Sequence, residues 1–121
     1  MIVERTNTGY SAYAKNYPVA TTGKDLTELK VKIVEALNLY FEESGHSITE
    51  NDIHVILDLP QFFQFYKVIN AKALAERIGM NQSLLAQYIT GKKKPSSSQT
   101  LRILKGVHQI GRELAEIRFL L

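Results

Sequence analysis

Two short helical patterns on either side of a glycine constrain this chain more than any other feature of its sequence. The apolar residues of the first pattern are Leu74, Ala75 and Ile78. The apolar residues of the second, which fall on one helix face, are Leu84, Leu85, Tyr88 and Ile89. Gly79 supplies a turn between them, Asn81 can cap the second helix, and the small Ala75 lets the two helices approach closely. The combination predicts a helix-turn-helix.

The second helix is expected to present polar side chains outward near its N-terminal end. These residues are Gln82, Ser83 and Gln87. A glutamine amide carries the donor and acceptor that match the adenine edge in the major groove, and a serine hydroxyl can bond to several base edges. The N-terminal residues of a recognition helix are those that reach the bases. The three residues therefore predict base readout in double-stranded DNA, with plain solvation of polar side chains as the alternative.

A run of three lysines follows this helix after Gly91. Lys92, Lys93 and Lys94 precede Pro95 and Ser96, which places three ammonium groups in a loop. Such groups suit phosphate contacts, which position a protein on DNA without reading its sequence. Most short lysine runs are merely solvated, but the position of this run after a recognition helix favours phosphate binding.

Charge is divided unevenly along the chain. Residues 1–69 hold six Lys/Arg against nine Asp/Glu, and residues 70–121 hold nine against three, so the balances are −3 and +6. A basic half suits an anionic partner such as nucleic acid. Scatter of surface charge in a short chain is the alternative.

The first half reads as a small sheet with one helix. Strands are predicted at residues 2–5, 10–15, 19–22 and 52–57, the first two forming a hairpin. Asp25 and Glu28 have the spacing of a capping box before a helix over residues 26–43, and Gly45 is suited to ending it. The predicted fold is α+β: a β-β-β-α-β domain over residues 1–59, followed by an all-α domain over residues 60–121.

The first half gives little evidence for a catalytic or metal-binding site. His46 and His54 are not spaced as metal ligands on a helix, and surface or structural roles are the simpler interpretation. No set of nucleophile, base and orienting group is visible, and the chain contains no cysteine. We therefore expect no catalytic residue, no metal and no cofactor. No apolar run has the length of a signal peptide or a membrane span, so a cytoplasmic protein without a membrane partner is expected.

Two apolar sets flank the helix-turn-helix. After Pro60, which can open a helix, the spaced residues Phe62, Phe63, Tyr66 and Ile69 are read as core, with a base-stacking platform as the alternative. A final helix over residues 97–121, capped by its serines, carries one stripe for the domain core and a second that needs a partner. The second stripe, a predicted dimer interface, is Ile103, Val107, Ile110, Leu114 and Ile117. Phe119, Leu120 and Leu121 extend it, and His108 is expected at the surface or the interface.

These residues carry a family resemblance. Leu74-Ala75, Gly79, Gln82-Ser83, Gln87 and the run from Gly91 to Ser96 resemble the Cro/C1-type (XRE-type) helix-turn-helix motif. The fuller pattern, which adds residues 68–75, 87–96 and 108–114, resembles the HicB family of antitoxins. In the first half, residues 10–13, a proline turn and residues 22–28 resemble that family's partial RNase H-like domain.

The resemblance implies a protein with two functions. The N-terminal domain would be non-catalytic and would bind and block a HicA-like toxin that cleaves mRNA, and the acidic balance of this half suits a basic toxin. The C-terminal domain would bind the operator of its own operon as a homodimer or higher oligomer and repress it. Gln82, Ser83 and Gln87 would read bases. Contacts to the DNA backbone would come from Asn70, Lys72, Tyr88, Lys92, Lys93 and Lys94.

The resemblance departs at one turn, where the family commonly has a sequence like Asp-Leu-Pro-Gly and this chain has residues 16–19, Asn-Tyr-Pro-Val. The difference bears on local toxin contacts more than on the fold. Two other functions remain open: a stand-alone transcription regulator whose N-terminal half senses a small ligand, and an RNA-processing enzyme that uses its RNase H-like half. The lack of a convincing acidic metal cluster in the sequence argues against the enzyme.

Overall fold

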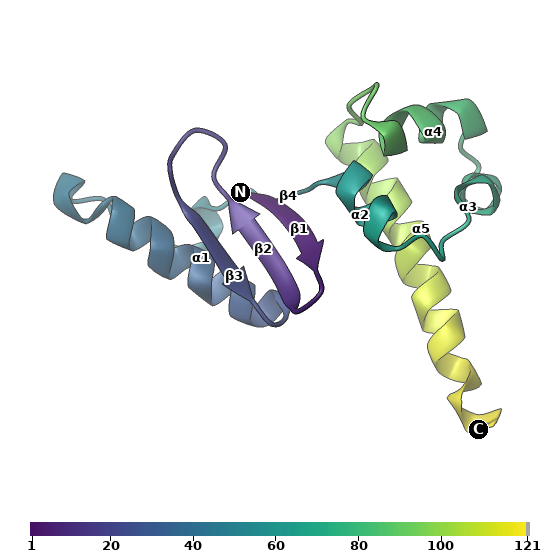
Figure 1. Ribbon diagram of the computed structural model, residues 1–121, viewed down its shortest axis with the longest axis horizontal. Coiled ribbons are helices and arrows are strands. Elements are labelled where there is room, and N and C mark those ends of the chain that lie inside the picture. The colour runs from purple at the N-terminus through teal and green to yellow at the C-terminus, as the bar shows by residue number, and fades with distance from the viewer. Residues whose placement is uncertain (121) are drawn as a thin grey trace. The chain divides into compact units, whose positions relative to one another are not determined.

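The computed structural model describes residues 1–120 and divides into two compact units, Met1–Phe65 and Tyr66–Leu121. A four-stranded sheet lies in the N-terminal unit, and the described residues contain five α-helices (Figure 1). The predicted α+β fold class is thereby confirmed. The division falls after Phe65, six residues beyond the expected domain boundary. Among the described residues, no helix combines the length and the hydropathy needed to cross a bilayer.

The sheet of the N-terminal unit has the strand order β3-β2-β1-β4. Strands β1 (Ile2–Thr6) and β2 (Gly9–Tyr13) form the predicted hairpin, and β3 (Ala20–Gly23) pairs antiparallel with β2. Strand β4 (Ile56–Leu57) instead pairs parallel to β1, with Ile2 opposite Ile56. The terminal ammonium group of Met1 donates to the carbonyl oxygen of His54 at 2.8 Å and secures the same edge.

Helix α1 (Leu26–Tyr40) packs on one face of this sheet, against β2 and β3 (Figure 1). The carboxylate of Asp25 accepts from the backbone N–H of Glu28 at 2.8 Å, which confirms the predicted N-cap. The return bond goes from the backbone N–H of Lys24 to Glu28, not from Asp25 itself. The unit's core consists of Val3, Ala12, Val19, Leu29, Ile33 and Leu37.

Helix α1 ends three residues before its predicted end, and a short 3-10 turn, η1 (Glu42–Ser44), follows it. The predicted strand at residues 52–57 is also shorter than expected. Asp52 belongs to a second 3-10 turn, η2 (Glu50–Asp52), where its carboxylate accepts from the backbone N–H of Thr49 at 2.9 Å. This capping bond holds the start of the segment in a turn, and the paired strand is limited to Ile56 and Leu57.

Helix α2 (Leu59–Phe65) belongs to the N-terminal unit because it packs on β1. The side-chain amide of Gln61 accepts from the backbone N–H of Arg5 at 2.9 Å and donates to its carbonyl oxygen at 2.6 Å. Gln61 thus continues the hydrogen bonding of the β1 edge beyond β4. The Arg5 guanidinium lies 4.8 Å from the ring centre of Tyr10 and 5.1 Å from that of Phe65.

The C-terminal unit consists of α3 (Ala71–Ile78), α4 (Gln82–Thr90) and α5 (Ser97–Glu116), followed by a 3-10 turn, η3 (Ile117–Leu120). Ser96 caps α5, as the serines before the helix predict. Helix α5 ends at Glu116, earlier than predicted, because the chain continues as η3. Leu121 lies outside the described residues. The buried side chains of this unit are Leu74, Ala75, Met80, Leu85, Tyr88 and Ile103.

Candidate nucleic-acid interface

The turn between α3 and α4 is built as the sequence predicts. Gly79 ends α3 at φ +67°, a left-handed conformation that disfavours residues with a side chain. Asn81 then caps α4, and its side-chain oxygen accepts from the backbone N–H groups of Ser83 at 2.9 Å and Leu84 at 3.2 Å. Met80 lies between them and is buried, so the turn is anchored in the core. These contacts fix the direction in which α4 leaves α3.

Helix α5 supports the same turn from outside the motif. The Arg102 guanidinium donates to the carbonyl oxygens of Ile78 and Gly79, at 2.8 and 2.7 Å. Carbonyl groups at the end of a helix have no partner within it, so Arg102 stabilises the C-terminus of α3. Nothing in the residue spacing pointed to this bond, because it joins side chain and backbone 23 and 24 positions apart.

Two further contacts join α5 to α3. An ion pair connects Arg77 and Glu113 at 2.6 Å, and hydrogen bonding from Arg77 lowers the pKa of the Glu113 carboxyl below its usual value. A Cβ atom placed at Gly106 would lie 2.4 Å from a methyl carbon of Ile78, closer than two carbons can approach. Glycine at this position is thus what allows α5 to lie against α3.

The outward face of α4 carries the three residues expected to read bases. Gln82, Ser83 and Gln87 are exposed, whereas Leu85 and Tyr88 on the opposite face are 1% and 5% exposed. The predicted division of α4 into an inward and an outward face is confirmed. The helix is therefore held through its apolar side, and its amide and hydroxyl groups remain available to a ligand.

The residues expected at the DNA backbone have different positions. Lys72 is exposed in the first turn of α3. Asn70 is exposed as well, but its side-chain oxygen caps α3 by accepting from the backbone N–H of Ala73 at 3.0 Å. The Tyr88 side chain belongs to the core and leaves little surface for a phosphate contact.

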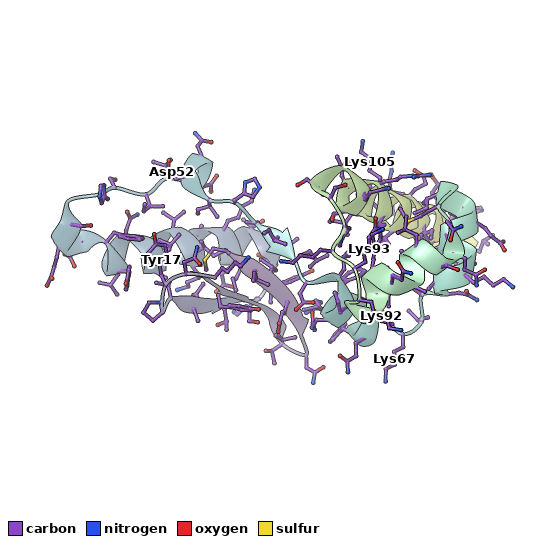
Figure 2. All side chains as sticks on the ribbon, turned by 90° about the horizontal axis from the view of Figure 1, so that it is seen from above. Tyr17, Asp52, Lys67, Lys92, Lys93 and Lys105 are labelled. Atoms are coloured by element: carbon purple, nitrogen blue, oxygen red, sulfur yellow. The ribbon has the colours of Figure 1, made fainter. Side chains whose placement is uncertain are left out.

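The loop that contains Lys92, Lys93 and Lys94, here called the lysine loop, is held against the end of α4. Gly91 has φ +79°, and the backbone N–H of Lys93 donates to the carbonyl oxygen of Gln87 at 3.2 Å. The side chains of Lys92, Lys93 and Lys94 are all exposed. Figure 2 labels two further lysines of this unit, Lys67 and Lys105, which are also exposed. These two are isolated in the sequence, and no pattern singles them out.

The predicted dimer stripe on α5 divides into two parts. Ile103 is fully buried in the core of the unit and has no surface to offer a second copy. Val107 and Ile110 are half-buried, and Leu114 and Ile117 are 60% and 53% exposed. Phe119 and Leu120 are also exposed. The apolar surface that lacks a cover is therefore the C-terminal end of α5 with η3, not the whole stripe.

In the N-terminal unit, the parallel pairing of β4 with β1 brings two carboxylates together. Burial raises the pKa of Glu4, and the nearby Asp58 charge and a hydrogen bond to Asp58 raise it further. Asp58 also accepts from the backbone N–H of Gln61 at 3.1 Å. The described residues contain no group of three or more His, Asp or Glu placed to hold a metal ion. The sequence did not reveal the Glu4–Asp58 pair because it depends on a parallel strand pairing.

Comparison of the chain with protein-family models, curated proteins and solved structures gives no match. The argument for a function therefore rests on the residues and their geometry. The most informative part of that geometry is the exposed polar face of α4, next to an exposed lysine loop.

Proposed function

We propose that the C-terminal unit is a helix-turn-helix that reads operator DNA, and that the chain is an autorepressing antitoxin of a type II toxin–antitoxin system. In this proposal the N-terminal unit is a partial RNase H-like domain that binds and blocks a HicA-like, mRNA-cleaving toxin. The protein works as a homodimer or higher oligomer and has no catalytic activity of its own.

A single observation carries the DNA-binding part. Helix α4 exposes Gln82, Ser83 and Gln87 on one face, while its opposite face is buried and the helix packs against α3, which in turn packs against α5. Base readout needs donors and acceptors on a helix whose own position is rigid, because a bidentate amide contact tolerates little displacement. The bonds of Asn81 and Arg102 at the turn supply that rigidity.

Charge supports the same interpretation. The C-terminal unit carries ten Lys/Arg and three Asp/Glu, and the three adjacent lysines directly follow α4. Neutralising phosphates releases bound counterions, which supplies affinity that does not depend on sequence. The lysine loop would therefore provide affinity and position, and the face of α4 would provide specificity.

The exposed end of α5 supports a dimer. Leu114, Phe119 and Leu120 are 60%, 82% and 72% exposed, an amount of apolar surface that usually marks an interface. A two-fold dimer would place two copies of α4 on the two half-sites of a palindromic operator.

DNA binding is tested with the full chain and a fragment taken from upstream of its own gene. Fluorescence anisotropy should show a Kd for this fragment at least ~10³-fold lower than for a scrambled one. Gln87→Ala should cost roughly 1–3 kcal/mol on the cognate fragment only. Gln64→Ala, the same change at an exposed position in α2, serves as the control. Equal losses on both fragments would contradict base readout by Gln87.

The antitoxin role is tested with the product of the adjacent reading frame. Co-expression should give a complex that copurifies, and this chain should restore growth of cells that the neighbour alone arrests. Failure of both assays would overturn the antitoxin role. Operator binding that responded to a small metabolite would then favour the stand-alone regulator.

A further inference from the structure

Three aromatic rings meet at the C-terminal end of α1. The Tyr17 ring, from the loop between β2 and β3, lies 5.7 Å from the ring of Tyr40 and 5.1 Å from that of Phe41. The rings of Tyr40 and Phe41 are 4.9 Å apart. We call these residues, together with the adjacent Glu42 and Glu43, the aromatic–acidic end of α1. Figure 2 labels Tyr17 at this cluster.

Phe41 anchors the cluster to the core, whereas the two tyrosines are exposed. Phe41 is half-buried and packs against the core of the N-terminal unit, which fixes the two tyrosines beside it. Tyr17 and Tyr40 nevertheless remain 47% and 46% exposed, and Leu39, which precedes Tyr40 in the last turn of α1, is 73% exposed.

The α1 side of the cluster is acidic, whereas Lys15 lies two positions before Tyr17 in the β2–β3 loop and the His46 ring lies 6.4 Å from that of Phe41. No Lys or Arg occurs between Lys32 and Lys67, whereas six acidic residues do. Residues 1–32 hold five Lys/Arg and three Asp/Glu, so the net negative charge of the N-terminal unit comes entirely from its second half. Glu42 and Glu43 are exposed on η1, and within residues 1–120 neither has an ion-pair partner.

We infer that the aromatic–acidic end of α1 is the surface on which the N-terminal unit receives a basic protein, and that arginine side chains of that protein are its main contacts. The inference rests on the proposed function, because the basic protein is then the RNA-cleaving toxin. A protein that binds RNA needs positive charge for the phosphates. Covering those groups with carboxylates and rings would keep RNA away.

The chemistry of the surface matches arginine better than any other side chain. A guanidinium binds a carboxylate through two parallel hydrogen bonds and also stacks on the face of a tyrosine ring. Tyrosine is among the residues that contribute most to binding at protein interfaces, and a rigid pair of tyrosines loses little entropy on binding. Leu39 adds exposed apolar area in the last turn of α1.

The inference is tested on the full chain, with the inactivated product of the adjacent reading frame as the probe. Surface plasmon resonance at low and high salt would measure association and dissociation rates. The double variant Glu42→Gln/Glu43→Gln should slow association roughly threefold to tenfold at low salt and much less at high salt. Glu76→Gln/Glu116→Gln changes the net charge equally in the C-terminal unit and should leave association unchanged.

Apolar and aromatic contributions are tested separately. Leu39→Ala and Tyr40→Ala should each raise the Kd for the probe about tenfold or more, mainly through faster dissociation. Leu26→Ala makes the same change as Leu39→Ala at an exposed position at the other end of α1, and should have no effect. Far-UV circular dichroism and operator affinity, both unchanged, would show that the variants are folded.

These outcomes distinguish failure of this inference from failure of the proposed toxin-binding function. A wild-type chain that does not bind the probe overturns the toxin-binding function and this inference with it. A wild-type chain that binds, with all variants of the aromatic–acidic end binding equally well, overturns the inference alone. Sedimentation of the chain without the probe gives a third outcome: if the Glu42/Glu43 variant loses self-association instead of toxin binding, a second copy is the partner and the inference is wrong.

Discussion

The two units of this protein are stabilised by different kinds of contact. In the N-terminal unit the edge of β1 is paired with β4, more than 50 positions away in the sequence. The same edge is also bound by the side-chain amide of Gln61, which bonds to the backbone of Arg5. In the C-terminal unit, α3 and α4 are adjacent helices set by a three-residue turn. The difference explains why local sequence patterns describe the C-terminal unit more completely.

The units also differ in charge and in what they expose. Met1–Phe65 has a balance of −4 and Tyr66–Leu121 one of +7, counted from their Lys, Arg, Asp and Glu. The N-terminal unit exposes rings beside carboxylates, and the C-terminal unit exposes amides beside lysines. One chain therefore carries surfaces suited to two chemically opposite partners.

The largest effect is expected from the core of the N-terminal unit. Ile33 is 1% exposed, and Ile33→Ala should cost about 2–5 kcal/mol of that unit's stability through lost burial and a cavity. Urea unfolding followed by circular dichroism should show an earlier first transition, with operator affinity retained at low urea. Val31→Ala, on the exposed side of the same helix, is the control. A parallel loss of operator binding would show that the units do not fold separately.

A matched pair of glycines in α5 tests the C-terminal unit. Gly106→Ala should destabilise that unit by about 1–3 kcal/mol, because its Cβ would overlap with Ile78. At Gly111 a new Cβ would have no atom within 4 Å. Gly111→Ala should therefore stabilise the helix by roughly 0.5–1 kcal/mol. Thermal unfolding of both variants measures the difference. Equal effects would mean that α5 does not approach α3 as closely as described.

Replacing Lys92, Lys93 and Lys94 by glutamine should weaken binding to all DNA sequences alike. The slope of log K against log salt should become shallower by about 0.9 for each lost phosphate contact. The measurement is a salt titration of anisotropy on the cognate and scrambled fragments. A triple variant of Lys15, Lys24 and Lys30, exposed lysines of the N-terminal unit, should keep the wild-type slope. An unchanged slope in the first variant would show that the loop does not touch DNA.

The smallest effect is expected at the Arg77–Glu113 pair. The pKa of Glu113 is lowered in the folded chain, so the pair stabilises the C-terminal unit above the ordinary carboxyl pKa. That contribution is lost as the pH falls through the lowered pKa. Glu113→Gln should therefore be slightly less stable than wild type at pH 7, and the difference should disappear in strong acid. Glu116→Gln, another exposed carboxylate of α5, should show no such change in urea midpoint with pH.

Local signals in the sequence predicted most of the elements and much of the candidate interface. Asp25, Asn81 and Ser96 cap the helices they were expected to cap, because a cap depends on residues two or three positions away. The outward face of α4 followed from helical spacing in the same way. Ile103 and α2 were misplaced because their surroundings depend on which distant helix or strand they meet. Spacing shows that a residue is apolar on one face, but it does not show which apolar surface covers it.

The parallel pairing of β1 with β4 also has a consequence for how the protein is made. Strand β1 is synthesised first but acquires this neighbour only after Leu57 has been added. At roughly 5–20 residues per second, about 3–11 s of translation separate the two events. During that interval the nascent hairpin has an unpaired edge that another chain can join. A protein that bound this unpaired edge during synthesis would protect it from pairing with another chain.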